Sequence, residues 1–483
     1  MMRWWLICQL GLVGGLGFLG STTGADEAYL AMGIRVGEVT QTSAIVWTRI
    51  TAQPNRRSAG VPPRTKVSRT RVMVDNLPIP VEKREGAVPG TAGQIRLKLA
   101  ENRRLTQAET TQWSDVDAAS DYTKQFRLAH LRPARKYFLR VEARKNAAAK
   151  ITNSAVGSFT TPGNSDTWQD VRFAVITGQM YYHRDSKDGF RIYPAMRKLD
   201  LKFLVPTGDT VYYDRDNPRA KSVELCRHHW HRMYSLPWLV DFHREVPGYW
   251  EKDDHDTYFD DCWPTYRAPW IEPLTYAQAG RVFREQVPIG EKLYRTIRWG
   301  KGLQIWLVEG RDFRSPNTMP DGPRKTIWGQ RQKAWLKRSL LASDATFRVL
   351  IDPTPIVGPD NSKQADNHAD AAFAHEGGEF RRWVRLQGLD NFFICCGDRH
   401  WQYMSVDPET GLREFSCGPT SDVHAFDGPG KDPRWHRFYR AGGGFLSVSV
   451  TRPAGKPAIA FRFHDVDGHV LSEFVENATS RIK

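Results

Sequence analysis

The hydrophobic pattern changes character about a third of the way along the chain. Before that point, strand-like runs are short, at 32–35, 42–47 and 137–143, and in the last of them apolar and polar residues alternate. A period of two predicts strands with one buried face. From residue 171 onward, continuous apolar runs typical of strands buried on both faces alternate with helical stretches. We therefore expect an all-β, immunoglobulin- or fibronectin-like sandwich followed by a layered α/β domain.

The α/β part can be divided into elements. Buried strands are predicted at 171–176, 201–205, 303–308, 347–351 and 391–396. Helices are predicted at 190–199, 220–239, 330–341 and 378–386. Because residues 163–170 form a polar linker, we expect an N-terminal β-sandwich domain over 26–162 and the α/β domain over 163–483. Residues 51–125 carry no pattern clear enough to place.

The first 25 residues have the form of a targeting segment. Arg3 precedes an apolar, glycine-broken run from residue 6 to 19, and small residues follow at 21–25. This order predicts a cleaved signal peptide and a secreted or periplasmic protein. The run falls short of the ~20 residues that a membrane span needs. No other stretch is apolar enough for a transmembrane segment.

Composition and charge narrow the classes of function. Apolar residues make up 40% of the chain, which excludes an extended disordered protein. The net charge is +15, and +12 of it lies in residues 1–162. This basic excess is either an ordinary solvated face or a source of attraction to anionic surfaces. Aromatic residues do not alternate with the basic ones there, so no specific nucleic-acid binding is expected.

Several Cys, His and Trp residues lie outside any catalytic pattern. Five cysteines follow the signal segment, an odd number that argues against a disulfide framework, although a Cys226–Cys262 bridge stays open. The histidines at 228, 229 and 231 are interpreted as one solvated face of a helix. Trp250, Trp263, Trp270 and Trp401 are expected around the mouth of a site.

Four polar segments follow predicted strands or turns and carry the candidate chemistry. They read T-G-Q-M at 177–180, G-D-T-V-Y at 208–212, W-E-K-D-D-H-D at 250–256 and C-G-D-R-H-W at 396–401. Carboxylate and imidazole groups are suitable ligands for one or two cations. A carboxylate can bridge two metals about 3.5–4 Å apart, the spacing of two-metal hydrolysis. Ligands at strand ends are held rigidly.

The order of these motifs resembles that of a known family. Two segments of the first part come first along the chain: L-x-P-x-x-x-Y-x-x-x-V-x-A at 131–143 and G-x-F-x-T-P at 157–162. Three motifs follow them in this order: a strand with G-D, then D-H-D, then a strand with G-D-x-H. With G-R-D-F-R-S at 310–315, the chain resembles the alkaline phosphatase D (PhoD-like) family of calcineurin-like metallophosphoesterases over most of 28–450. That family joins an N-terminal β-sandwich to a metallophosphoesterase domain.

The resemblance implies roles for individual residues. Asp209 takes the position of a bridging carboxylate, and His255 that of the histidine that steadies developing charge and protonates the leaving oxygen. The metal ligands implied are Asp209, Tyr212, Asp254, Asp398 and His400. Weaker candidates for substrate or supporting contacts are Gln179, Arg311, Asn367 and His368.

One position departs from the family pattern. Gly178 stands where the family usually has a cysteine that binds iron. Three consequences stay open: a single-metal enzyme, a ligand recruited from Gln179, His183 or Asp185, or a decayed site. Since the remaining ligands are mostly oxygen, a divalent metal such as calcium is favoured over iron.

The function expected is a secreted metal-dependent phosphatase or phosphodiesterase that hydrolyses phosphate esters with metal-activated water. No G-x-S-x-G segment offers a serine nucleophile. The sequence does not choose between monoesters and diesters. Two alternatives stay open: a catalytically impaired relative that binds phosphorylated or acidic polymers, and a hydrolase of the same fold that acts on another ester, such as a phospholipid or a sulfate.

Overall fold

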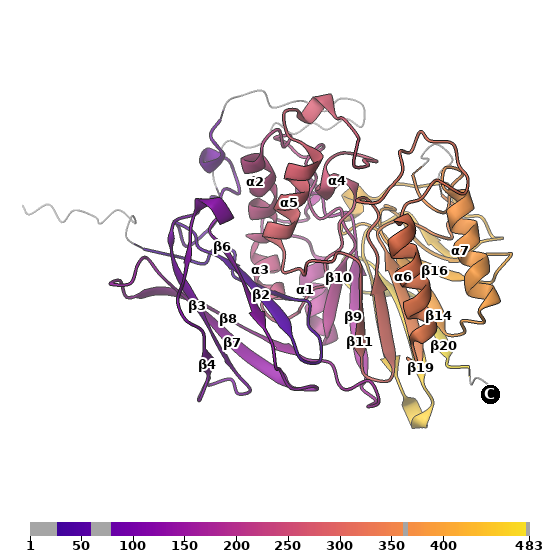
Figure 1. Ribbon diagram of the computed structural model, residues 1–483, viewed down its shortest axis with the longest axis horizontal. Coiled ribbons are helices and arrows are strands. Elements are labelled where there is room, and N and C mark those ends of the chain that lie inside the picture. The colour runs from indigo at the N-terminus through magenta and orange to yellow at the C-terminus, as the bar shows by residue number, and fades with distance from the viewer. Residues whose placement is uncertain (1–26, 59–78, 361–365, 480–483) are drawn as a thin grey trace, which may run out of the picture.

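A computed structural model describes residues 27–58, 79–360 and 366–479 (Figure 1). The predicted signal peptide, residues 1–25, lies outside the described residues. None of the helices in the described ranges is both long and apolar enough to cross a membrane.

Two antiparallel sheets form a β-sandwich at the N-terminal side of the molecule (Figure 1). The first has the order β1-β2-β6: β1 (Ile34–Gly37), β2 (Ala44–Arg49) and β6 (Thr123–Leu128). The second has the order β4-β3-β7-β8, with β5 also paired to β3: β3 (Gly93–Ala100), β4 (Glu109–Thr110), β5 (Ser114–Val116), β7 (Lys136–Arg144) and β8 (Ile151–Thr160). Apolar side chains such as Val46, Leu97 and Val141 fill the space between the sheets. The unplaced segment 51–125 therefore supplies β3, β4 and β5.

Two larger sheets form the α/β part. The five-stranded sheet has the order β10-β9-β18-β19-β20: β9 (Val171–Ile176), β10 (Phe203–Pro206), β18 (Phe445–Thr451), β19 (Ala458–His464) and β20 (Val470–Asn477). The seven-stranded sheet has the order β11-β12-β13-β14-β16-β15-β17: β11 (Arg295–Trp299), β12 (Leu303–Leu307), β13 (Phe347–Asp352), β14 (Phe392–Cys396), β15 (Gln402–Val406), β16 (Arg413–Cys417) and β17 (His436–Arg440). Strands β9 and β10 run parallel, as do β12, β13, β14 and β16.

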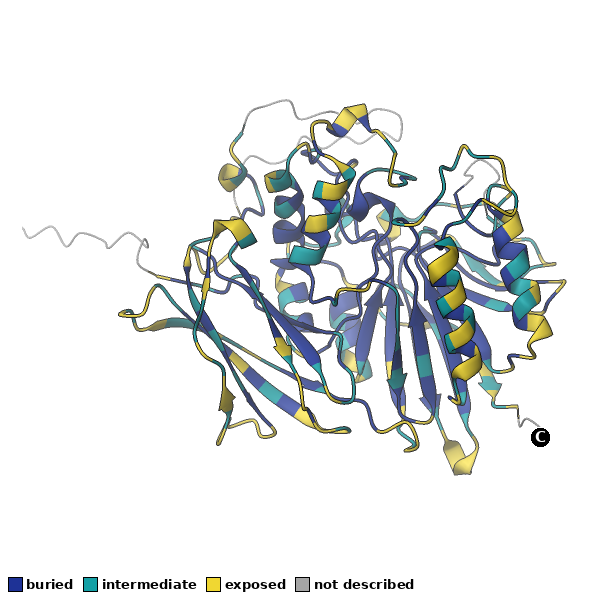
Figure 2. Cartoon of the chain, viewed as in Figure 1, coloured by how far each residue is buried: buried dark blue, intermediate teal, exposed yellow. Residues whose placement is uncertain are grey.

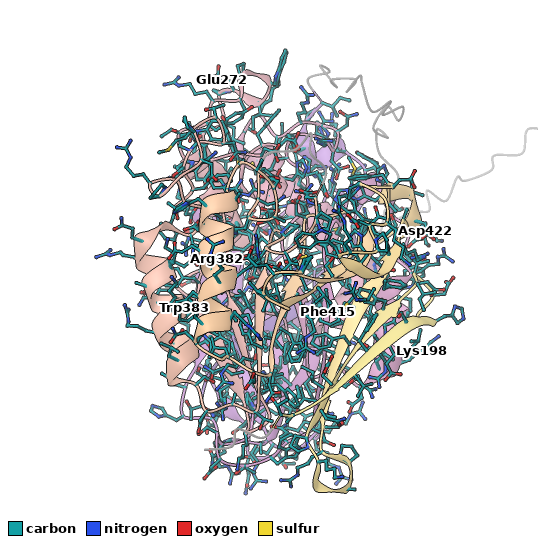
Figure 3. The ribbon with its side chains drawn as sticks, turned by 90° about the vertical axis from the view of Figure 1, so that its right-hand side faces the viewer. Lys198, Glu272, Arg382, Trp383, Phe415 and Asp422 are labelled. Atoms are coloured by element: carbon teal, nitrogen blue, oxygen red, sulfur yellow. The ribbon has the colours of Figure 1, made fainter. Side chains whose placement is uncertain are left out.

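The two larger sheets pack face to face. Phe415 of β16 stacks on Phe461 of β19 with ring centroids 3.9 Å apart and an interplanar angle of 8°. Figure 3 shows Phe415 deep in the molecule, whereas Arg382 and Trp383 lie on a helix near the surface. The central strands are buried along nearly their whole length (Figure 2). Burial on both faces explains why these strands read as continuous apolar runs.

Helices cover the outer faces of both sheets. They are α1 (Ile192–Met196), α2 (Val223–Tyr234), α3 (Pro237–His243), α4 (Asp254–Thr257), α5 (Tyr276–Gln286), α6 (Gly329–Ala342) and α7 (Ala374–Leu386). Apolar residues of α6 and α7 pack on β12, β13 and β14, and those of α1, α2, α3 and α5 pack with the outer face of β9 and β10. The result is a helix–sheet–sheet–helix arrangement, which confirms the predicted fold class.

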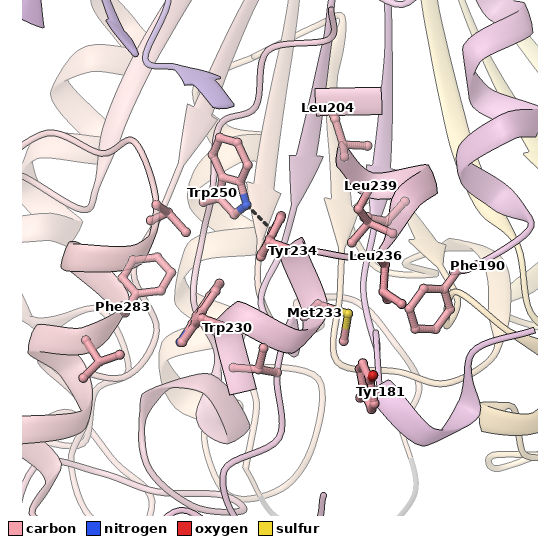
Figure 4. Close-up of a cluster of buried hydrophobic side chains, with 14 of the residues drawn as sticks. Tyr181, Phe190, Leu204, Trp230, Met233, Tyr234, Leu236, Leu239, Trp250 and Phe283 are labelled. Carbon is pink, nitrogen blue, oxygen red and sulfur yellow. Dashed lines mark hydrogen bonds between the residues drawn. The ribbon is translucent and has the colours of Figure 1, made fainter. Parts of the chain in front are cut away.

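The helical side contains a core rich in aromatic residues. Trp250 is fully buried there, and its Nε1 donates a hydrogen bond of 2.6 Å to the hydroxyl of Tyr234 (Figure 4). Trp250 therefore does not line the mouth of a site, and the expectation from the sequence that it would is wrong. Trp270 is 61% exposed, in the segment between α4 and α5.

Two further expectations about side chains are corrected. The predicted helix over 220–239 is two helices, α2 and α3, and its histidines are buried. His231 Nε2 lies 2.5 Å from Asp121 Oδ2 of the sandwich, because α2 is covered by the N-terminal sheets. Cys226 and Cys262 are both buried free thiols, so no bridge joins them.

Candidate functional site

The carboxyl ends of strands from both large sheets meet at one edge. Thr177, directly after β9, forms a parallel bridge with Pro419, which follows β16. The Thr177 hydroxyl also accepts a 3.2 Å hydrogen bond from the backbone N–H of Asp398, after β14. The loops that carry the predicted motifs are thereby brought together, at the edge where open α/β sheets place their ligands.

Both G-D pairs require glycine at their first position, because a Cβ there would clash with neighbouring atoms. A side chain at Gly208 would lie 2.4 Å from the backbone nitrogen of Asp253, and one at Gly397 would lie 2.1 Å from Thr207 Oγ1. The aspartates that follow them, Asp209 and Asp398, are left-handed, with φ of 53° and 61°. A non-glycine residue in this region costs about 1–2 kcal/mol. Such strain is concentrated at functional sites, where the surrounding structure maintains it.

Three of the predicted ligands form one contact group. The Tyr212 hydroxyl donates a hydrogen bond of 2.8 Å to Asp209 Oδ2 and lies 3.3 Å from His400 Nε2. His400 Nε2 in turn lies 3.6 Å from Asp209 Oδ2. The other carboxylate oxygen of Asp209 is buried and has no hydrogen-bond partner among the described residues.

The one-turn helix α4 presents Asp254 and His255 to this group. A capping box between Asp253 and Asp256 starts the helix, with the Asp253 N–H donating to Asp256 Oδ1 at 2.7 Å. Asp256 Oδ2 also accepts a 3.1 Å hydrogen bond from the N–H of Thr210. Asp256, the last aspartate of D-D-H-D, therefore holds α4 against the loop that carries Asp209.

His255 lies among three carboxylates. Its Nδ1 is 2.7 Å from Asp214 Oδ1, and its Nε2 is 3.4 Å from Asp260 Oδ1 and 3.9 Å from Asp254 Oδ2. Burial alone would lower the pKa of His255, but the negative charges of Asp214 and Asp254 raise it well above its ordinary value. The carboxylates around His255 therefore favour its protonated form, which can donate a proton.

The group fits a cation. Ligand atoms of Asp209, Asp254 and His255 all lie within 4.8 Å of one another. Burial, with the neighbouring carboxylates, raises the pKa of Asp209 well above its ordinary value. Asp254 Oδ1, like Asp209 Oδ1, is buried without a hydrogen-bond partner among the described residues. Crowded, buried and unsatisfied carboxylate oxygens form the donor set that a hard divalent cation takes.

Gly178 leaves room beside His400. A Cβ at this glycine would lie 3.1 Å from both Cδ2 and Nε2 of His400. The carbonyl of Gly178 accepts a 3.0 Å hydrogen bond from Nδ1 of His424, whose ring lies 3.9 Å from that of His400. His183 lies 4.9 Å from the His424 ring, centroid to centroid. Because a carbonyl can only accept, the tautomer of His424 is fixed with the lone pair on Nε2.

The other two candidates to replace the family's cysteine ligand have contacts elsewhere. The side-chain oxygen of Gln179 accepts a hydrogen bond from the Tyr193 hydroxyl. Asp185 accepts one of 2.8 Å from the N–H of Arg191. Of the three candidates to replace the cysteine, His183 is the one whose ring lies beside that of His424.

The weaker candidates form a buried layer behind the cluster. Arg311 Nε donates a 2.5 Å hydrogen bond to Asp253 Oδ1, while its Nη1 and Nη2 have no hydrogen-bond partner among the described residues. Asn367 Nδ2 donates to Asp360 Oδ2 at 2.5 Å. His368 Nε2 lies 3.1 Å from Glu376 Oε2 and is fully buried.

Sequence reasoning missed several residues of the site. These are Asp214, Asp256, Arg399 and His424. Asp214 follows Asp209 by five positions, and only the turn of the chain between them places its carboxylate on His255. Arg399, the variable position of G-D-x-H, pairs with Asp398, and its Nη2 lies 2.9 Å from Asp366 Oδ1. His424 stands alone in the sequence and carries no spacing signal.

Comparison with known proteins bears on the family and the fold. The sequence profile described as "PhoD-like phosphatase" matches residues 173–433, and that of its N-terminal domain matches residues 19–163. No curated protein sequence matches the chain. A solved structure titled "Structure of PhoD" superposes with a TM-score of 0.72 at 15% identity, covering 93% of this chain and 90% of that one.

A purple acid phosphatase from yellow lupin (Lupinus luteus) seeds superposes with a TM-score of 0.59 at 10% identity. The match covers 92% of this chain and 73% of that one. At these identities the two structures establish the fold, and the family profile, which spans more than half of the chain, establishes the family. The chain belongs to the PhoD-like phosphatase family and is a phosphoester hydrolase.

Proposed function

We propose that the chain hydrolyses phosphate esters by direct attack of water on phosphorus, at the cluster formed by Asp209, Asp254 and His255. The observation that carries the proposal is the mutual approach of these three groups within 4.8 Å in a buried site, with carboxylate oxygens left unsatisfied. Asp209 and Asp254, together with Asp398, His400 and Tyr212, form the proposed ligand set, and His255 lies beside it without ligating the cation.

A divalent cation held by these side chains would acidify a water molecule and neutralise the phosphate oxygens. The side chains available to hold it are three carboxylates, one phenol and one imidazole. Oxygen ligands in this majority suit calcium better than softer metals. The hydrogen bond to Gly178 uses Nδ1 of His424 and leaves the lone pair on Nε2. His424 is therefore a further candidate nitrogen ligand on the side of His400.

His255 is proposed as the acid that protonates the leaving oxygen. Its protonation is favoured by Asp214, and its orientation is fixed by the 2.7 Å contact between Nδ1 and Asp214 Oδ1. With Nδ1 engaged in this way, Nε2 carries the proton that faces the cation cluster. Arg311 is proposed to bind a phosphate oxygen with Nη1 or Nη2, which have no other hydrogen-bond partner in the described structure.

The substrate is proposed to be a phosphate ester met outside the cytoplasm. The apolar segment 6–19 supports export. The sandwich has a core between its own sheets, distinct from the core between the two larger sheets, and this supports the domain division at residues 162–163. Elemental analysis and hydrolysis of p-nitrophenyl phosphate and bis-p-nitrophenyl phosphate, measured on one sample, test the proposal. Bound divalent metal with turnover that His255→Ala abolishes is the expected result.

A further inference from the structure

A groove of about 480 Å³ lies on the sandwich, on the outer face of β7 and β8. One wall is the turn between β3 and β4, which contributes Arg103 and Leu105. The other wall is the chain just after α3, which contributes Arg244 and Glu245. The groove therefore lies where the sandwich meets the α/β part.

The floor of the groove is a row of alternating side chains on β7. Lys136, Phe138 and Arg140 share one face because side chains alternate along a strand. Lys136 and Arg140 are exposed, and at ~3.3 Å per residue they lie about 13 Å apart. Phe138, half-buried between them, has the ammonium of Lys136 5.4 Å from its ring centroid. Val156 of β8, cross-strand partner of Arg140, adds apolar surface and is 46% exposed.

The positive charge of the groove is largely uncompensated. Within the described structure, Arg103, Lys136 and Arg140 form no ion pair. Arg244 pairs with Asp241 at 2.8 Å, and the one acidic lining residue, Glu245, is itself paired with Arg197 at 3.1 Å. Three exposed cations thus face a concave surface that has a single aromatic ring on its floor.

A backbone hydrogen bond ties the floor of the groove to the wall after α3. The N–H of Ser158 on β8 donates a 2.9 Å hydrogen bond to the carbonyl of Arg244. Gly157 makes this approach possible, because a Cβ there would lie 2.2 Å from the same carbonyl oxygen. A groove built in this way is formed before a ligand arrives, which reduces the entropy lost on binding.

We propose that this groove binds an anionic polysaccharide. The separated cations match charges that lie a few units apart along a linear polymer, and Phe138 with Val156 offers an apolar floor for the C–H face of a sugar ring. A single-stranded nucleic acid needs successive aromatic platforms, and the groove has one ring. A flat membrane surface cannot follow a concave floor. The site is independent of the phosphoesterase cluster.

Binding of dextran sulfate to the full-length protein tests the proposal, with neutral dextran, poly-glutamate and oligo-dT as competing probes. The variant Lys136→Gln/Arg140→Gln removes both cations of the floor. Because two exposed charge contacts are lost, we expect the double variant to bind dextran sulfate about tenfold more weakly. Phe138→Ala in the wild-type background should also weaken binding without changing net charge.

The matched control is Arg331→Gln/Arg338→Gln, which removes two exposed cations from α6 and leaves the groove intact. It should bind dextran sulfate within twofold of the wild type. Unchanged melting temperatures exclude misfolding as the cause of any loss. Equal losses in the two double variants would overturn the proposal, since net charge alone would then account for binding. Stronger competition by oligo-dT or poly-glutamate than by dextran sulfate would also overturn it.

Discussion

The imidazole Nδ1 of His255 lies 2.7 Å from Oδ1 of Asp214, and both side chains are buried. The second oxygen of Asp214 accepts a 3.1 Å hydrogen bond from the N–H of Asp260, so the carboxylate cannot rotate freely. This pair fixes which nitrogen of His255 faces the cation cluster. It connects the loop after β10 with α4, two segments that are 41 residues apart in sequence.

Replacing Asp214 by asparagine keeps the shape of the side chain and removes its charge. We expect kcat for bis-p-nitrophenyl phosphate to fall by about 10–100-fold, with metal content and KM little changed. Asp260→Asn is the control, because that carboxylate is 35% exposed and lies 3.4 Å from Nε2. Equal losses in the two variants would contradict a special positioning role for Asp214.

Removing the cluster's central carboxylate should remove the metal. Asp209→Asn is expected to lower the bound divalent metal, measured by elemental analysis after dialysis, together with activity. Tyr212→Phe loses one contact to Asp209 and should lower metal content less. Full metal occupancy in Asp209→Asn would show that the cation is held elsewhere.

Adding a single methyl group at Gly178 tests the space beside His400. Gly178→Ala puts a Cβ 3.1 Å from the His400 ring in a backbone with φ of 62°, so we expect lower metal content and lower stability. Gly388→Ala is the matched control: its φ is 56° and no atom lies within 4 Å of the new Cβ. Both variants should lose about 1–2 kcal/mol from left-handed strain. Only Gly178→Ala should lose metal.

Stability should fall in mild acid. Burial lowers the pKa of His243 to about 3, and its nitrogens have no hydrogen-bond partner among the described residues. In the unfolded chain the pKa returns to about 6.5, so the unfolded state binds an extra proton between these values. Between pH 6.5 and 4.5 this one group lowers the free energy of unfolding by about 2–3 kcal/mol.

Denaturant unfolding at pH 7.5 and 4.5 measures this effect. His243→Phe fills the same aromatic surroundings without a titrating group. On going from pH 7.5 to 4.5, the variant should therefore lose about 2–3 kcal/mol less free energy of unfolding than the wild type. His375→Phe, at an exposed position, is the control and should keep the wild-type dependence. An unaltered pH dependence in His243→Phe would contradict the assignment.

The fold was predictable because burial leaves a strong pattern. The run at 171–176 is β9 as predicted, and the run at 391–396 is β14 to within one residue. Burial on both faces makes such strands uniformly apolar, so the apolar runs in the sequence give the strands in their order along the chain. The polar segments after these strands do lie together at one edge, because parallel strands present their carboxyl ends on the same side.

The parts that could not be predicted depend on contacts between distant segments. The α2 histidines look like a solvated face, but all three are buried, His231 against Asp121 of the sandwich and His229 against Pro218. No local pattern records what packs on a helix. Asp214 and His424 are single residues without spacing to a partner, and only the folded loops bring them to His255 and His400. The roles of the predicted ligands stay predictions until a cation is bound.

The most direct test of the account is the metal dependence of phosphoester hydrolysis by the wild type and by His255→Ala. Each protein is stripped with chelator, assayed with bis-p-nitrophenyl phosphate, and assayed again after calcium, manganese or iron is added back. The account predicts no turnover without metal, restored turnover in the wild type, and a deficit of about 10²–10⁴-fold in His255→Ala at equal metal content. Turnover that survives metal removal, or that His255→Ala leaves unchanged, would contradict it.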